Sequence, residues 1–272
     1  MGSGALQYDG VRTVTANWAL RQAAPPPPFL MEDFLVDVLA DTPYVSVAAS
    51  GIPTGAAAIS ATAGDPVPGY GGWLAGATDD VDAEIDEIAV GGLAATASWL
   101  RASQVGKGFI VCEWGISVPG ALTTRQYFAG LSDDPTEGTT TNGALNIQTA
   151  YTLVDVADDA AGWIFSSLAT APTVWKYAST DSQVGSAVSA TTEGRTQVAN
   201  TWIGLRTEID VNGDCYFSDR SVRGGNVTFY GKTDVGTSPD VLLVPLFTAA
   251  PTTTAAVSWE LDYCFASASH AV

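Results

Sequence analysis

Alternation of apolar and polar residues close to the C-terminus constrains the fold of this chain most. In the segment AVSWELDYCFAS, residues 256–267, every second side chain is apolar. The apolar series is Val257, Trp259, Leu261, Tyr263 and Phe265, and the intervening series is Ser258, Glu260, Asp262 and Cys264. Because successive side chains of a β-strand point to opposite faces of the sheet, this period of two predicts a strand with one buried face.

Further strand patterns extend from residue 108 into the second half of the chain. GFIVCEWGI, residues 108–116, is apolar on both faces except at Glu113, which predicts a central strand covered on both sides. Four shorter runs are RQYFAGLS at 125–132, GWIFSS at 162–167, TVWKYAS at 173–179 and VLLVPLFTA at 241–249. The chain has 272 residues, 46% of them hydrophobic, enough for one large β domain. We therefore predict an all-β fold: a two-sheet antiparallel sandwich.

The segment TEIDVNGDCYFS, residues 207–218, has two interpretations. Asp210, Asn212 and Asp214 alternate around Gly213 as in a calcium loop. Such a loop needs glycine at its sixth position and glutamate at its twelfth, and counting from Asp210 these positions hold Cys215 and Ser221. Asn-Gly between apolar alternations instead favours a β-hairpin with a two-residue type I′ turn. We predict the hairpin.

One acidic segment does not read as a strand. GATDDVDAEIDEIAVGG, residues 76–92, has Val81, Ile85 and Ile88 at helical spacing. We expect a short amphipathic helix or an acidic loop here, with a solvated acidic face. Glu84 and Asp86 also begin a Glu-x-Asp-x-Glu pattern of sandwich glycoside hydrolases, but the third position is Ile88, so the pattern is broken.

Residue types that catalytic and metal sites need are scarce. His270 is the only histidine, and we interpret Cys112, Cys215 and Cys264 as small buried hydrophobes. We expect no enzyme activity, no cofactor and no metal centre. Two alternatives stay open: a surface calcium site from loop oxygens, and sugar binding by some of the eight tryptophans. The acidic loop residues are Asp133, Asp134, Glu137, Asp158 and Asp159, and the tryptophans in loop-like contexts are Trp18 and Trp73.

Charge excludes two classes of partner. The chain has 29 acidic and 11 basic residues, a net charge of −18, so we expect it to bind neither nucleic acid nor anionic membranes. The N-terminus, MGSGALQYDG, lacks the pattern of a signal peptide, and no apolar stretch approaches membrane-spanning length. We expect a chain that is made and kept in a cytoplasm, or that leaves it inside an assembly or by lysis.

A proline run divides the chain. Four consecutive prolines in AAPPPPFLMEDF, residues 23–34, favour polyproline II, as a stiff spacer or as a segment docked on a partner. We predict an extended N-terminal arm over residues 1–30 and a jelly-roll sandwich over 31–272. The candidate partner-binding residues are Trp18, Pro25, Pro26, Pro27, Pro28 and Phe29.

The order of several short motifs resembles one known family. These are MEDFLVD, YFAGLSDD, AGWIFSS, TWIGLRTEIDVNGDCYFS and WELDYCFAS, spread over about residues 31–266. Together they resemble the concanavalin A-like jelly-roll domains of tailed-bacteriophage structural proteins. The N-terminal arm has no counterpart in that family.

This resemblance implies a role in the virion. It implies a capsid decoration (cement) protein on the outer surface of the phage head, assembled in the host cytoplasm. Its partners would be the major capsid protein and copies of itself, with a trimer as the expected oligomer. The alternative is a lectin-like module of a tail or head fibre that binds a carbohydrate receptor. A glycoside hydrolase is disfavoured by the broken carboxylate pattern.

Overall fold

The computed structural model describes most of the chain from residue 100 onward and separate segments before it. The described residues are 4–8, 12–16, 29–32, 45–50, 74–77, 85–90, 100–106, 108–133, 144–155, 157–253 and 256–268. Apart from the single-turn 3₁₀ helices η1 (Ala102–Gln104) and η2 (Ala190–Thr192), every described element is a β-strand. No described helix has the length and apolar character needed to cross a membrane.

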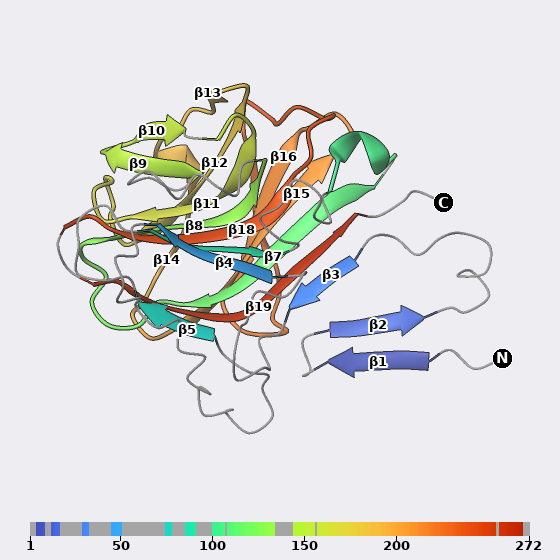
Figure 1. Ribbon diagram of the computed structural model, residues 1–272, viewed down its shortest axis with the longest axis horizontal. Coiled ribbons are helices and arrows are strands. Elements are labelled where there is room, and N and C mark those ends of the chain that lie inside the picture. The colour runs from blue at the N-terminus through green and yellow to red at the C-terminus, as the bar shows by residue number, and fades with distance from the viewer. Residues whose placement is uncertain are drawn as a thin grey trace.

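Two large antiparallel sheets form the body of the molecule (Figure 1). The eight-stranded sheet runs in the order β13 (Val184–Gly185), β12 (Val174–Asp181), β11 (Ala160–Ser166), β8 (Arg125–Ser132), β18 (Val244–Pro251), β6 (Ile85–Val90) and β4 (Val45–Ser50), with β14 (Glu193–Thr196) also pairing with β12. The seven-stranded sheet runs in the order β17 (Thr228–Lys232), β16 (Cys215–Arg220), β15 (Trp202–Asp210), β7 (Phe109–Ser117), β19 (Ser258–Ala268) and β3 (Phe29–Glu32), with β5 (Leu74–Ala77) also pairing with β19.

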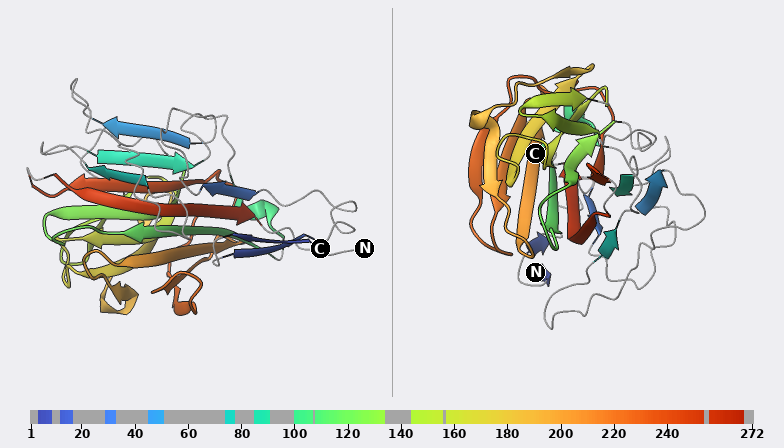
Figure 2. Two further views of the ribbon diagram at one scale, coloured as in Figure 1. Left: turned by 90° about the horizontal axis from the view of Figure 1, so that it is seen from below. Right: turned by 90° about the vertical axis from the view of Figure 1, so that its left-hand side faces the viewer.

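Two small hairpins complete the strands. They are β1 (Gly4–Tyr8) with β2 (Arg12–Ala16), and β9 (Leu145–Thr149) with β10 (Thr152–Asp155). In the left view of Figure 2 the strands of both large sheets run roughly along the long axis of the molecule, as in an aligned sandwich. The predicted all-β fold is confirmed. The strands predicted at residues 108–116, 125–132, 162–167, 173–179 and 241–249 appear as β7, β8, β11, β12 and β18, in that order.

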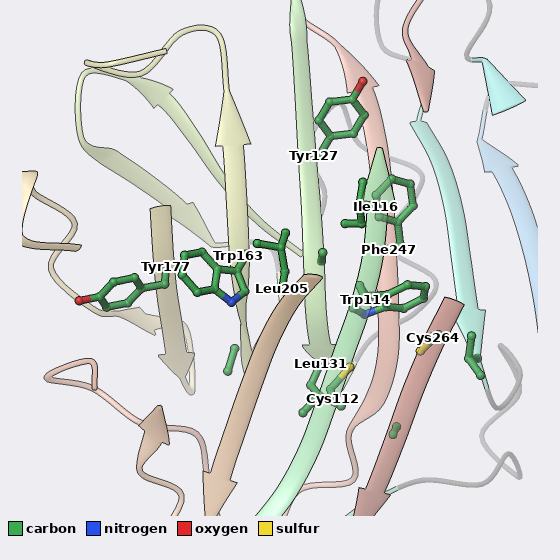
Figure 3. Close-up of a cluster of buried hydrophobic side chains, with 14 of the residues drawn as sticks. Cys112, Trp114, Ile116, Tyr127, Leu131, Trp163, Tyr177, Leu205, Phe247 and Cys264 are labelled. Atoms are coloured by element: carbon green, nitrogen blue, oxygen red, sulfur yellow. The ribbon is translucent and has the colours of Figure 1, made fainter. Parts of the chain in front are cut away.

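Aromatic side chains from both sheets meet in the core (Figure 3). Trp114 of β7 packs against Phe247 of β18, with ring centroids 6.0 Å apart. Tyr177 of β12 stacks on Phe217 of β16 at 4.8 Å, and Trp163 of β11 contacts the same ring edge to face. Each pair joins a strand of one sheet to a strand of the other, so burial of these rings holds the two layers together.

The eight-stranded sheet is buried on its second face as well. Ile164 of β11 and Leu246 of β18 point away from the central core and pack with Leu145 and Ile147 of β9. The β9–β10 hairpin and its flanking residues therefore cover this face. This double burial explains why β11 and β18 read in the sequence as nearly continuous apolar runs.

Strand β19 departs from its predicted alternation. Trp259 and Leu261 face the core as predicted, but the register against β7 shifts between Leu261 and Tyr263. After this bulge Cys264 lies in the core, whereas Tyr263 lies on the outer face, where its hydroxyl bonds Glu113. A β-bulge inserts one residue and reverses the faces beyond it, so the predicted single apolar face through Tyr263 and Phe265 was wrong.

The acidic segment before residue 90 is also different from its prediction. Ile85–Val90 forms β6, which lies between β18 and β4 and is buried along its whole length. Asp86 is only 2% exposed, and its carboxylate accepts a hydrogen bond of 2.6 Å from Nε1 of Trp259. The helix or loop expected here was wrong for residues 85–90, and so was the solvated acidic face, because this bond satisfies a carboxylate inside the core.

The predicted hairpin is confirmed, although its turn is longer than expected. Strands β15 and β16 pair through Ile209 and Cys215, and a three-residue loop joins Asp210 to Asp214. Only Gly213 in this loop has a positive φ, at 87°. The turn is therefore not type I′, which would need positive φ at two residues. Both acidic side chains have structural partners: Asp210 accepts from two backbone amides, and Asp214 pairs with Lys232 at 2.9 Å.

Candidate functional site

The residues predicted to bind a partner lie mostly outside the described part of the chain. Trp18, Pro25, Pro26, Pro27 and Pro28 are outside it. Phe29 is the first residue of β3, where its backbone pairs with Ser267 of β19. The division of the chain at residue 30 therefore stays a prediction.

The tryptophans divide by burial. Trp114, Trp163, Trp175 and Trp259 are fully buried. Trp18, Trp73 and Trp99 lie outside the described residues. Trp202, the first residue of β15, is half-buried and points to the outer face of the seven-stranded sheet. Of the described tryptophans, Trp202 is therefore the one that can contact a ligand.

The indole of Trp202 is held in one orientation. Its Nε1 donates a hydrogen bond of 2.9 Å to Oδ2 of Asp262, a carboxylate that is 2% exposed and also pairs with Arg223. The ring lies over Gly204, where an added Cβ would come within 2.8 Å of the indole. The ring is also tilted against Tyr263, with centroids 6.3 Å apart. Glycine beneath the ring and a fixed hydrogen bond at its edge pre-organise the aromatic surface.

Trp202 lines an open cleft of about 510 Å³, which we name the Trp202 cleft. The described residues that line it are 195–198, 201–203 and Ser221. Its walls therefore come from β14 of one sheet, from β15 of the other, from the segment that joins these two strands, and from the residue that follows β16. Gln197 is the buried anchor of this region, since its Oε1 accepts from Trp175 at 2.8 Å and its Nε2 donates to two backbone carbonyls at 2.9 Å.

A bidentate ion pair fixes one wall of the Trp202 cleft. Nε and Nη2 of Arg195 donate to the two carboxylate oxygens of Asp219 at 3.1 and 2.9 Å. Asp219 is completely buried and also accepts from the Tyr230 hydroxyl at 2.9 Å. The hydrogen bond with Asp219 raises the pKa of Arg195. The Arg195 side chain is 34% exposed, so one edge of the guanidinium is anchored and the rest remains accessible.

A second polar group lies beside Trp202 on the outer face of the seven-stranded sheet. At its centre is Glu113 of β7, which is 5% exposed and accepts a hydrogen bond of 2.5 Å from the Tyr263 hydroxyl. Arg206 and Arg220 each approach the same carboxylate at 3.6 Å, and Arg206 also bonds Glu208. This network matches two arginines with two carboxylates, and Tyr263 connects it to the indole of Trp202.

The acidic turns do not assemble a cation site within the described residues. Oδ1 of Asp133 accepts from the amide of Asp159 at 3.1 Å, and Asp158 accepts from Gln183. Burial raises the pKa of Asp133 to about 6 and also raises the pKa of Asp159. No group of three or more potential metal ligands occurs among the described residues, and Asp134 and Glu137 lie outside them.

Aromatic, cationic and hydroxyl groups line the Trp202 cleft. It presents an aromatic ring, a guanidinium and the hydroxyl side chains of Thr196, Thr201 and Ser221. The sequence did carry a signal for Trp202. In TWIGLRTEID it falls on the polar face of the alternation together with Gly204 and Arg206, and a tryptophan on that face does not belong to the core.

Comparisons with known proteins identify the fold. The sequence matches no family model and no curated protein. Among solved structures, a protein of unknown function from Shewanella oneidensis MR-1, SO2946, has a TM-score of 0.51 at 10% identity, over 90% of this chain and 87% of that one. Peanut lectin, solved with a nine-residue peptide, has a TM-score of 0.52 at 7% identity, over 89% of this chain and 97% of the lectin.

A weaker likeness extends to an enzyme. The GH43 protein BlXynB of Bacillus licheniformis has a TM-score of 0.48 at 10% identity, over 88% of this chain but 39% of that protein. At that score and coverage it says nothing about the activity of this chain. The two matches above a TM-score of 0.5 each cover about nine-tenths of this chain, whose strands form two antiparallel sheets, so this chain has the concanavalin A-like jelly-roll fold that its sequence predicts.

Proposed function

We propose that this chain is a carbohydrate-binding protein and that the Trp202 cleft is its site. The observation that carries the proposal is the fixed, half-buried indole of Trp202 at the wall of an open polar cleft. A sugar ring offers an apolar face of C–H groups and a rim of hydroxyls. It therefore fits a surface that pairs a partly exposed aromatic ring with hydrogen-bonding side chains.

The dimensions of the cleft support this proposal. Small-molecule sites have volumes of roughly 300–1,000 Å³, and the Trp202 cleft has about 510 Å³. This volume suits one or a few sugar rings. Because Trp202, Gln197 and Arg195 are already held by protein hydrogen bonds, little side-chain entropy would be lost on binding.

We infer that the chain binds its ligand without transforming it. Glycoside hydrolysis uses a pair of carboxylic acids that flank the scissile bond. The described lining of the Trp202 cleft contains no Asp or Glu. Asp86, a member of the broken sequence pattern, is bonded to Trp259 inside the core and cannot contact a sugar at the surface.

Glycan-array binding followed by titration calorimetry tests this function. We expect the intact chain to bind a defined set of oligosaccharides and Trp202→Ala to weaken that binding at least tenfold. Phe229→Ala is the matched control, because it removes an exposed aromatic ring, 65% accessible, on β17. Equal affinities for wild type and Trp202→Ala would refute the site. Failure of any glycan to bind at high protein concentration would refute the function.

A second candidate is the virion role implied by the sequence resemblance. What supports it in the structure is a set of exposed apolar side chains at the end of the seven-stranded sheet. Val222, Val227 and Phe229 are 59%, 46% and 65% exposed, and β17 has only one strand partner among the described residues. Exposed apolar residues on an edge strand are typical of surfaces that another chain covers. On this proposal the partners are capsid subunits and copies of the chain itself.

Capsid co-sedimentation tests the virion role and its predicted anchor separately. Deleting residues 1–28 should abolish association with capsids and leave the β circular dichroism intact. Phe229→Lys should weaken it if the β17 edge contributes. Association that survives the deletion would show that the arm is not the anchor, and a chain that never sediments with capsids would end this candidate.

A further inference from the structure

We propose that the saccharide bound in the Trp202 cleft is anionic, and that Arg195 binds its acidic group. This inference rests on the proposed carbohydrate function and deepens it by naming the class of ligand.

The distribution of charge is the first argument. The whole chain has a net charge of −18, with 29 acidic residues. The described residues lining the Trp202 cleft include no acidic side chain and one cation, Arg195. A surface this acidic repels anions over most of its area. In the cleft, by contrast, the described lining offers an anionic group the accessible part of the Arg195 guanidinium, and the Asp219 carboxylate that pairs with it is buried behind it.

The geometry of Arg195 is the second argument. Asp219 takes the Nε edge of the guanidinium, and Nη2 also donates to Oγ1 of Thr228 at 3.3 Å. Within the described part of the chain, Nη1 makes no hydrogen bond. Two N–H groups on a guanidinium that is already fixed therefore remain for a ligand.

The third argument concerns which ligand group these donors prefer. A guanidinium has no acceptor, so it can bind only ligand oxygens that accept. Hydroxyls and acidic groups both qualify, but charge-assisted hydrogen bonds are roughly twice as strong as neutral ones. Gln197 cannot substitute for Arg195, because its amide is already engaged with Trp175 and the backbone. A carboxylate and a sulfate ester share this chemistry.

The experiment compares glycans in matched pairs. Each acidic glycan bound on the array is titrated beside its carboxyl-reduced or desulfated counterpart, which distinguishes carboxylate from sulfate. We expect the acidic member to bind at least tenfold more tightly, with an affinity that falls as salt is raised. Equal binding of acidic and neutral members would overturn this inference while leaving the proposed function intact. Absence of any glycan binding would overturn both.

Variants then assign the effect to one residue. Arg195→Lys keeps a positive charge beside buried Asp219 but lacks the guanidinium fork. We expect it to lower affinity for the acidic glycan about tenfold and leave that for the neutral counterpart unchanged, whereas Trp202→Ala lowers both. A urea midpoint checks that Arg195→Lys folds. If Arg195→Lys does not fold, the salt dependence of glycan binding by the wild type decides whether the ligand is bound through its charge. An acidic preference that survives in folded Arg195→Lys would refute the assignment to Arg195.

Discussion

Replacing Trp259 with phenylalanine should destabilise the fold more than the same replacement at Trp114. Both indoles are fully buried in the same core cluster, so the loss of ring volume is similar. They differ in their hydrogen bonds. Trp259 donates to the Asp86 carboxylate at 2.6 Å, whereas Trp114 donates to the Gly130 carbonyl at 3.3 Å.

The expected difference follows from the two acceptors. A hydrogen bond to a charged group contributes about 1.5–3 kcal/mol and a neutral one about 0.5–1.5 kcal/mol, and 3.3 Å is longer than the usual N–H···O distance. Trp259→Phe also leaves a buried carboxylate without that donor. We expect its loss of unfolding free energy to exceed that of Trp114→Phe by about 1–2 kcal/mol.

Urea denaturation followed by circular dichroism measures this difference. The midpoint of each variant, with an unchanged slope against denaturant, gives the change in unfolding free energy. Losses equal within about 0.5 kcal/mol would show that the Asp86 bond does not stabilise the core. The hydrogen bond from Trp259 would then no longer explain why the Asp86 carboxylate is tolerated in a buried strand.

Three further predictions concern the turn, the acidic loops and the thiols. Gly213→Ala should cost more stability than Gly120→Ala. Both glycines have a positive φ, but only at Gly213 would an added Cβ meet a backbone oxygen, at 1.9 Å. Equal urea midpoints of the two variants would contradict this. Burial raises the pKa of Asp133 from 3.8 to about 6, so the folded state binds this proton more tightly and the wild type should lose stability as pH rises from about 4 to 6. The free energy of unfolding of Asp133→Asn, minus that of the wild type, should therefore be larger at pH 7 than at pH 4. A difference that does not change with pH would refute this. The three cysteines are buried, and burial raises the pKa of Cys215 to about 12, so a thiol reagent should label none in the native protein and three after unfolding.

The sequence was most informative where one local pattern matched one environment. The apolar run around Trp114 predicted a central strand covered on both faces, and β7 is that strand. The Asn-Gly pair predicted the hairpin between β15 and β16. In both cases the period of the side chains and the chemistry of the turn agreed with the tertiary structure.

The errors came from features that a local pattern does not contain. The bulge after Leu261 in β19 is set by pairing with β7, far away in the sequence. Strand β6 contains Asp86 and Glu87 but lies between two strands, and Trp259, 173 residues away, satisfies Asp86. Local charge therefore predicted exposure where a distant donor had made burial possible.

The candidate site shows the same limit. The sequence drew attention to Trp18 and Trp73 because their contexts look like loops, and both lie outside the described residues. Trp202 was overlooked because it opens a strand. Its proposed role depends on Asp262 and Gly204, and on Arg195 of the other sheet, and only the fold brings these residues together.

Fluorine NMR of protein labelled with 5-fluorotryptophan tests the central claim most directly. We expect a separate signal from each of the eight tryptophans, and Trp202→Phe identifies the signal of Trp202 by its loss. On titration with a glycan found on the array, we predict that the Trp202 signal shifts with saturation while those of buried Trp114 and Trp259 stay in place. A shift confined to another tryptophan, with the Trp202 signal unchanged, would contradict the account.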